Sequence, residues 1–437
     1  MTRNTLRMIA RPAAATVALL CATAVVAAAQ QVTAIQGGTV LTMAGETIEN
    51  GTVLIQDGKI AAVGASVRVP GDAQLIDASG KYVMPGIIDA MTYYGIRPFE
   101  LNDRSSPVTP QNRAIQAYYP YGDFMRGKTG INVDKDLISG GVTTVYIAPG
   151  DRQVIGGQGA VVKTWGDDFT SMILREPAAM DMTIGETAKR EEQNPTTRMG
   201  IAALLRRTLL ETQEFAQKIA DFERKKAEEG EDATPPARDL GKEALAKLLA
   251  KELPARIEVD YLDDIRTAIR LAEEFDFDLI LDSGLGAYKI KDVLAEKDIP
   301  VVLGPPTHPF VTGGEVSMNA DLYNLMSEDN AAELTEAGVK IAIGSFGFGF
   351  GSFGGATQGR WLLVEAAYAT GYGLSDEEAL KAITINAAEI LGVADRVGSL
   401  EVGKDADIIV LDGYPLHVKT WVDLVMINGA VIHERTR

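Results

Sequence analysis

The sequence predicts an α/β fold in which a (β/α)8, TIM-like barrel carries a small β-sandwich formed by both termini. Two observations predict it. Short strand patterns joined by hairpin turns occur near the two ends of the 437-residue chain, whereas the long middle region alternates apolar strands with helical patterns. Parallel strands need helical crossovers, so a barrel accounts for the middle, and a shared β domain accounts for the ends.

Hairpin signals mark both ends of the chain. Asp57-Gly58 and Asn428-Gly429 each separate two short apolar runs that are rich in β-branched residues. Both dipeptides favour the two-residue turns that match the twist of paired strands. The predicted sandwich therefore has one part in residues 30–84 and a second part in residues 397–437.

The middle region, residues 85–396, carries eight strand patterns. They lie near residues 87–94, 141–148, 159–165, 178–184, 255–260, 278–283, 299–304 and 340–345. Eight strands with helical crossovers favour a closed barrel over an open sheet. A charged helical insertion is predicted at about residues 198–252, and a stretch rich in Gly and Pro, 229–236, breaks it in two.

The N-terminal segment differs from the rest of the chain. Three arginines precede an apolar run, residues 13–29, which ends in three alanines. This pattern predicts a secretory signal peptide over residues 1–29, with an uncleaved membrane anchor as the alternative. We expect an exported protein, periplasmic or secreted, that has no membrane contact after cleavage. Its single cysteine, Cys21, lies in this segment, so the mature chain would have no thiol for catalysis, metal binding or disulfides.

The charge of the chain limits its partners. The 42 basic and 60 acidic residues give a net charge of -18. Nucleic acids and anionic membranes repel such a surface, so neither is expected as a partner. A well-solvated acidic surface accounts for the charge.

Two distant motifs resemble the amidohydrolase superfamily. The first is Lys81-Tyr82-Val83-Met84-Pro85-Gly86-Ile87-Ile88-Asp89, which leads into the predicted barrel. The second combines Thr384-Ile385-Asn386-Ala387-Ala388 with Gly398-Ser399-Leu400-Glu401-Val402-Gly403-Lys404-Asp405-Ala406-Asp407. Val154-Ile155-Gly156-Gly157-Gln158-Gly159 and Ala287-Tyr288-Lys289-Ile290 are similar to secreted, imidazolonepropionase-like members. The resemblance covers nearly all of the mature chain.

The resemblance implies a metal-dependent hydrolase acting on carbon–nitrogen (but not peptide) bonds of amides and cyclic amides, and sometimes on esters. In this family zinc or another divalent metal at the C-terminal mouth of the barrel activates a water and polarises the carbonyl. Its usual ligands are a His-x-His pair on the first strand, single histidines on the fifth and sixth, and an aspartate on the eighth. Some members add a carboxylated lysine.

This sequence has other residues at each of those positions. They fall on Met91, Tyr93, Glu258, Ser283 and Phe346. A thioether is a poor ligand for zinc or manganese, and a phenyl ring is no ligand. The sequence therefore predicts a degenerate site, with no metal residues to assign and no cofactor expected.

The remaining candidates for chemistry at the mouth are charged. Lys163 ends a predicted strand, at the position of a carboxylated lysine or of an ordinary lysine that faces the mouth and pairs with an acid. Glu258 and Asp260 are two residues apart and share one face of a strand, with Asp282 on the next strand. These groups predict either a buried ion network or an acid–base set, and three carboxylates could also bind Ca²⁺ or Mg²⁺.

Three further features lie near the expected rim. His308 follows the seventh strand and is the one imidazole placed to act as a base there, or it bonds to nearby backbone. Glycines at 156–159 either cradle an anion or form a tight turn. In residues 344–355 phenylalanines alternate with glycines, and this loop either fills the mouth or packs its rings elsewhere.

Two hypotheses follow for function. In the first, the chain keeps the fold but not hydrolysis, and acts as a binding protein with a small-molecule ligand in the barrel mouth or as a partner subunit. Such a subunit would form a homo-oligomer, or a hetero-oligomer with an active amidohydrolase. In the second, it is an active hydrolase of amides or esters that uses a non-standard site, with no metal or with an oxygen-bound one.

Overall fold

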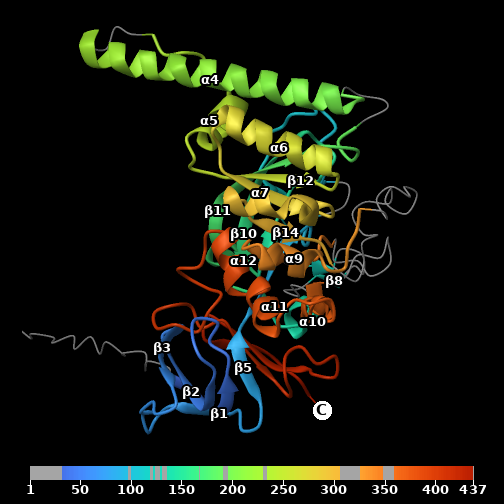
Figure 1. Cartoon of the computed structure of the whole chain (residues 1–437). Coiled ribbons are helices and arrows are strands. Elements are labelled where there is room, and N and C mark those ends of the chain that lie inside the picture. The colour runs from blue at the N-terminus through green and yellow to red at the C-terminus, as the bar shows by residue number, and fades with distance from the viewer. Residues whose placement is uncertain are drawn as a thin grey trace, which may run out of the picture.

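The computed structural model describes residues 32–96, 100–118, 122–123, 128–129, 135–166, 168–189, 195–229, 234–305, 325–347 and 359–436. Two large sheets organise this part of the chain, one at the base of the molecule and one curled into a barrel above it (Figure 1). The predicted signal peptide, residues 1–29, lies outside the described residues.

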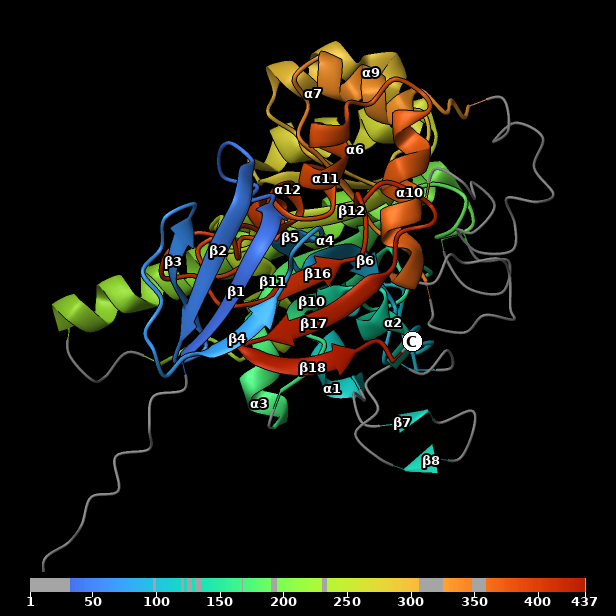
Figure 2. The ribbon, with the colours of Figure 1, turned by 90° about the horizontal axis from the view of Figure 1, so that it is seen from below.

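The basal sheet contains strands from both ends of the chain, as the sequence predicts. Its members are β1 (Val32–Val40), β2 (Ile48–Gln56), β3 (Lys59–Gly64), β4 (Gln74–Asp77), β5 (Tyr82–Pro85), β16 (Ile408–Leu411), β17 (Val422–Ile427) and β18 (Ala430–Glu434). Their order is β18-β17-β16-β5-β1-β2-β3, with β4 paired to β1. Antiparallel pairing of β5 with β16 joins the two ends of the chain in one sheet, which faces the viewer in Figure 2.

Both predicted hairpins are present. Asp57 and Gly58 turn β2 into β3 with φ angles of 53° and 75°, and Asn428 and Gly429 turn β17 into β18 with 50° and 77°. Positive φ at both central residues is what a type I′ turn requires, and Asn, Asp and Gly tolerate it best.

A single residue, Gly86, separates the basal sheet from the barrel. A Cβ atom here would lie 2.1 Å from Oγ1 of Thr143, so only glycine fits between β5 and the first barrel strand. The Gly86 N–H donates to the backbone oxygen of Asp407, which lies just before β16. The Pro-Gly of the first motif therefore packs directly against the second motif.

The barrel contains the eight predicted strands. They are β6 (Ile87–Thr92), β9 (Val142–Ile147), β10 (Ile155–Lys163), β11 (Ile173–Thr183), β12 (Ala255–Val259), β13 (Leu279–Ser283), β14 (Val301–Leu303) and β15 (Ile341–Ile343). They lie side by side in the order β15-β14-β13-β12-β11-β10-β9-β6. Residues after β15 close the circle, because the Phe346 N–H donates to Met91 O over 2.9 Å and the Tyr93 N–H donates to Gly347 O over 3.0 Å.

One barrel strand runs against the others. β10 pairs antiparallel with β9 and with β11, whereas the other neighbouring strands in this sheet pair in parallel. Short connections lead into and out of β10, and the second contains only the one-turn helix α3 (Phe169–Met172). The C-terminal end of β10 therefore lies at the basal sheet, opposite the C-terminal ends of its neighbours.

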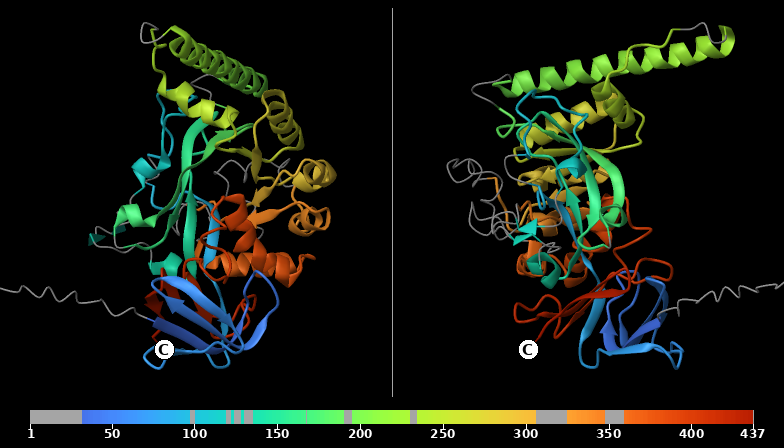
Figure 3. Two further views of the ribbon diagram at one scale, coloured as in Figure 1. Left: turned by 90° about the vertical axis from the view of Figure 1, so that its left-hand side faces the viewer. Right: turned by 180° about the vertical axis from the view of Figure 1, so that it is seen from behind.

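Helices cover the outside of the strands that follow (Figure 3). They are α6 (Leu262–Phe275), α7 (Lys291–Glu296), α9 (Asn330–Glu336), α10 (Leu362–Thr370), α11 (Asp376–Ala382) and α12 (Ile385–Ile390). In α6 the buried residues Ile265, Ala268, Ile269 and Ala272 recur every three or four positions, which aligns them along one face toward the barrel. Shorter elements are α1 (Ala114–Ala117), β7 (Gly122–Asp123), β8 (Lys128–Thr129) and α2 (Lys135–Ser139).

Two helices occupy the charged stretch between β11 and β12. α4 (Arg198–Glu229) crosses the top of the molecule in Figure 1, and α5 (Leu240–Leu249) packs beneath it. Asp239 caps α5, because its carboxylate accepts the Lys242 N–H over 3.0 Å. In the described part of the chain, no helix has the length and apolar character needed to cross a membrane.

Candidate functional site

The C-terminal ends of the parallel strands form the barrel mouth, which is the functional end of such barrels. Four of the predicted residues gather there from three strands: Tyr93 follows β6, Glu258 lies on β12, and Asp282 and Ser283 end β13. Asp260 follows β12 and joins them through its contact with Ser283.

A β-bulge interrupts β6 where the first-strand ligand pair is expected. In the pairing with β9, Asp89 is opposite Val145 and Thr92 is opposite Ile147, so three steps on β6 match two on β9. An extra residue of this kind bends a strand and re-aims its side chains. Met91 therefore lies inside the bulge, and its backbone oxygen bonds to the Phe346 N–H.

Tyr93 and Glu258 meet across the mouth. The Tyr93 hydroxyl donates to Oε2 of Glu258 over 3.2 Å, and both side chains are buried. Burial raises the pKa of the Glu258 carboxyl well above its usual range, and the negative charges of Asp151, Asp260 and Asp282 raise it further. Burial and Glu258 likewise raise the pKa of the Tyr93 hydroxyl. The phenol and the carboxyl thus satisfy each other.

Below this pair, an ion network fills the barrel interior. Arg256 donates from Nε to Oδ2 of Asp282 over 2.9 Å and from Nη2 to Oδ1 over 2.7 Å. Its guanidinium carbon lies 3.9 Å from the centroid of the Tyr146 ring, and the Tyr146 hydroxyl donates to Oδ2 of Asp181 over 2.8 Å. Burial raises the pKa of Asp181 and of Asp282, and the Arg256 charge opposes the rise. A buried cation with paired carboxylates is the first of the two interpretations of these charges.

Sequence reasoning missed Arg256, Tyr146 and Asp181. A signal existed for Arg256, because it stands two residues before Glu258 and alternation places both on one face of β12. Tyr146 and Asp181 come from strands separated by β10, and nothing in their local sequence indicates that they meet.

Gly159 makes the Tyr146–Asp181 contact feasible. A Cβ atom at residue 159 would lie 2.0 Å from the Tyr146 hydroxyl oxygen and 2.7 Å from Oδ2 of Asp181. The glycines at 156–159 lie within β10, so the interpretation as a tight turn is wrong. For Gly159, the absent side chain leaves room for a neighbouring ring.

Asp260 and Ser283 form a second polar pair at the mouth. The Ser283 hydroxyl donates to Oδ1 of Asp260, and Ser283 has a φ of 70°, a conformation that residues other than glycine rarely adopt. Burial raises the pKa of Asp260 to about 6. The pair places a hydroxyl beside a carboxylate that titrates near neutral pH.

Phe346 stands at the eighth-strand position and is packed in the core. Its side chain is 2% exposed, and its φ of 50° turns the chain as it leaves β15. Residues 348–358 of the Gly/Phe loop and His308 lie outside the described residues, so the predictions about them stay predictions.

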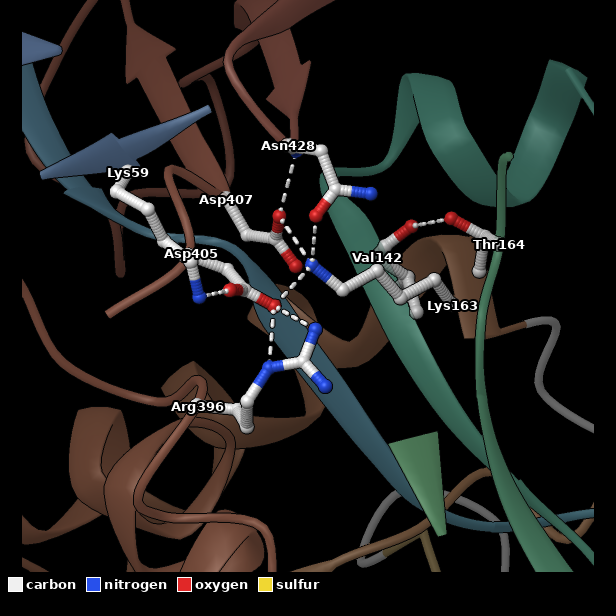
Figure 4. Close-up of polar contacts among 8 residues, drawn as sticks. All are labelled: Lys59, Val142, Lys163, Thr164, Arg396, Asp405, Asp407 and Asn428. Atoms are coloured by element: carbon white, nitrogen blue, oxygen red, sulfur yellow. Dashed lines mark hydrogen bonds and ion pairs between the residues drawn. The ribbon is translucent and has the colours of Figure 1, made fainter. Parts of the chain in front are cut away.

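Lys163 does not lie at the mouth, and that prediction is wrong. It ends β10, whose antiparallel direction places it at the basal sheet. There its Nζ atom lies 2.8 Å from Oδ2 of Asp405 and 2.9 Å from Oδ1 of Asp407, and it also donates to Oδ1 of Asn428 (Figure 4). The lysine is fully buried and paired with acids of the second motif.

The comparisons with known proteins agree with this fold. A sequence model of the amidohydrolase family matches residues 324–432. The chain is 26% identical over 408 residues to the amidohydrolase tasK of Hapsidospora irregularis, covering 85% of this chain and 39% of that protein. It is 24% identical over 427 residues to an imidazolonepropionase of Geobacillus sp. (strain WCH70), covering 88% of this chain and 90% of the relative.

Solved structures show the same relationship. The crystal structure of an amidohydrolase from Thermotoga maritima MSB8 is 34% identical and superimposes with a TM-score of 0.80, covering 92% of this chain and 100% of that chain. Molinate hydrolase, at 19% identity and a TM-score of 0.54, shares the fold. With both motifs, the barrel and the basal sheet in place, the chain belongs to the amidohydrolase family and is similar to imidazolonepropionases.

Proposed function

We propose that this chain is an exported, non-hydrolytic member of the amidohydrolase family that acts as a ligand-binding or partner subunit. One observation carries the proposal: the hydrogen bond between Tyr93 and Glu258. Two positions at which relatives of this kind hold a metal are here bonded to each other. A donor and acceptor that satisfy each other inside a barrel have no unmet need for an ion.

The other expected ligand positions also do not fit a divalent metal. Met91 offers a thioether, the side chain of Phe346 has no donor atom, and the Ser283 hydroxyl is engaged with Asp260. In the described residues, no group of three or more His, Cys, Asp or Glu side chains is arranged to hold a metal ion. We therefore derive no step of hydrolysis through a metal.

Two roles suit a barrel of this kind. A small molecule can bind at the mouth, where Glu258, Asp260 and Asp282 supply polar groups from adjacent strands. Alternatively, the chain assembles with an active amidohydrolase, as a subunit that keeps the family's fold. Export follows from residues 1–29 and is tested by the N-terminal sequence of the protein recovered from cells, which we expect to begin near Gln30.

The experiment combines metal analysis with a hydrolysis screen. The chain is purified without chelator, its zinc, manganese and iron are quantified, and a panel of amides, cyclic amides and esters is tested. We expect far less than one metal per chain and no turnover. Stoichiometric zinc or manganese with turnover would overturn the proposal.

A restored variant provides the matched control. It carries Met91→His, Tyr93→His, Glu258→His, Ser283→His and Phe346→Asp, which returns the family's usual ligand types to their positions. A gain of bound zinc in this variant shows that the assay detects a metal site in this barrel. Co-purification of the wild-type chain with a histidine-containing relative would support the partner role.

A second candidate function rests on the Ser283–Asp260 pair. In this version Ser283 attacks a carbonyl carbon, Asp260 accepts the hydroxyl proton, and the amine or alcohol departs, leaving an acyl-serine that water hydrolyses. The strained φ of Ser283 at the end of a barrel strand favours this version. Metal-free turnover that Ser283→Ala and Asp260→Asn both abolish would establish it and exclude the first.

A further inference from the structure

The long helix α4 is supported by the body of the protein along only its first half. A helix of this length extends about 48 Å. Its N-terminal half buries Ile201, Leu205, Leu209 and Thr212, spaced three or four residues apart. Its C-terminal half projects past the body of the molecule, as both Figure 1 and Figure 3 show.

The apolar stripe of α4 continues into the projecting half. Phe215 is followed at the same spacing by Ile219 and Phe222, but Ile219 is 37% exposed and Phe222 is half-buried. Residues 217–220 and 223–228 are all exposed. The side of the helix that packs onto the body in one half is therefore presented to solvent in the other.

Local charge pairs keep this half helical. Gln217 donates to Oδ1 of Asp221 over 2.9 Å, and Arg224 lies 3.1 Å from the same oxygen. The ammonium of Lys226 lies 5.9 Å from the centroid of the Phe222 ring. Contacts between residues three or four apart stabilise a helix that lacks tertiary support. The projecting half is thus a formed surface, and an apolar stripe rimmed by charges is typical of an interface.

The charge of this half selects its partner. Between residues 216 and 228 the basic side chains are Lys218, Arg224, Lys225 and Lys226, and the acidic ones are Asp221, Glu223 and Glu228, which gives a net charge of 4 - 3 = +1. The chain as a whole carries -18, so two copies repel each other over most of their surfaces. They can approach with least repulsion through this segment.

We infer that residues 216–228 of α4 form a self-association surface, on which a second copy of this chain docks in antiparallel orientation about a two-fold axis. An isologous contact lets each copy cover the Ile219–Phe222 stripe of the other, and it closes the assembly at two chains. The inference does not depend on whether the barrel hydrolyses a substrate, and the two are tested by different measurements.

The test is the oligomeric state of the chain purified as cells produce it, measured by sedimentation equilibrium from low to high micromolar concentration. We expect a dimer that Ile219→Glu with Phe222→Glu weakens by about tenfold or more, since the change places charge in the apolar contact. The matched control, Met199→Glu, alters a residue that is 80% exposed at the supported end of α4 and leaves the dimer intact.

Salt provides an independent readout. Screening reduces the repulsion between two acidic bodies more than it weakens an apolar contact, so the dimer tightens as NaCl rises from 0.05 to about 0.5 M. A monomer at all concentrations, a dimer indifferent to the Ile219/Phe222 variant, or binding only to a different protein would overturn the inference.

Discussion

The ammonium of Lys163 lies 2.9 Å from Oδ1 of Asp407, although 244 residues separate them in the sequence. Lys163 ends the one antiparallel barrel strand, and Asp407 immediately precedes β16 in the basal sheet. Asp405 completes the arrangement by accepting from Lys163, Arg396 and Lys59 together (Figure 4). Both carboxylates belong to the second family motif, so this motif holds the barrel to the sheet.

Lys163→Met should therefore destabilise the fold by about 3–5 kcal/mol, because it leaves two buried carboxylates without their shared cation. Urea unfolding measures the loss. Lys59→Ala serves as the control, since its side chain is 47% exposed and an exposed partner of Asp405 contributes only about 0–1 kcal/mol. Equal effects of the two variants would show that burial at Lys163 does not matter.

The Arg256–Asp282 pair predicts a compensating double variant. Arg256→Met alone leaves the Asp282 carboxylate buried and unpaired, with an expected loss of about 3–5 kcal/mol. Arg256→Met with Asp282→Leu should recover most of that loss, because an apolar pair replaces an ionic one at small cost. Additive losses in the double variant, measured by denaturant unfolding, would contradict a direct pair.

Asp89 predicts a pH dependence of stability. Burial raises its pKa to about 6, against the two hydrogen bonds that its Oδ1 accepts from the Ser345 and Met91 N–H groups. Between about pH 4 and pH 6 the folded state holds a proton that the unfolded state releases. The contribution of this group to the free energy of unfolding, about 2–3 kcal/mol, is thus present at low pH and lost as pH rises through 6.

Asp89→Asn tests this dependence, because the amide cannot titrate and its oxygen still accepts both N–H groups. Urea unfolding at pH 4.5, 6 and 7.5 should give a smaller decrease with pH in the variant than in the wild type. The readout is the slope rather than the absolute stability, since Oδ2 is buried and has no hydrogen-bond partner in the described part of the chain. An unchanged slope would exclude Asp89 as the source.

Gly159→Ala should cost about 1–3 kcal/mol, because the added Cβ would collide with the Tyr146 hydroxyl beside Asp181. Thermal unfolding measures the loss. Gly45→Ala is the matched control, since a Cβ at residue 45 would meet nothing within 4 Å. If both variants unfold at the wild-type temperature, the ring is free to move aside.

The order of the strands could be predicted from the sequence because each barrel strand is an apolar run with clear boundaries. The direction of β10 could not, since a strand reads alike in both directions and only its neighbours determine its sense. This one direction moved Lys163 from the mouth to the base. The bulge in β6 was also invisible, because it depends on pairing with β9.

The candidate site divides in the same way. Glu258, Asp260, Asp282 and Ser283 stand at the ends of strands that the sequence locates, so their gathering at the mouth was predictable. Their partners were not. Glu258 bonds to Tyr93 and Asp282 bonds to Arg256, because the barrel brings residues from distant parts of the chain within hydrogen-bond distance.

By itself the sequence determined the family, the eight strands and the joining of both termini in one sheet, because these depend on local patterns and on motifs that are contiguous. The tertiary structure decided which charged groups pair, which end of the barrel each one faces, and that α4 extends beyond the body. Those outcomes depend on burial and strand direction, and a buried charge adopts whichever partner the packing places beside it.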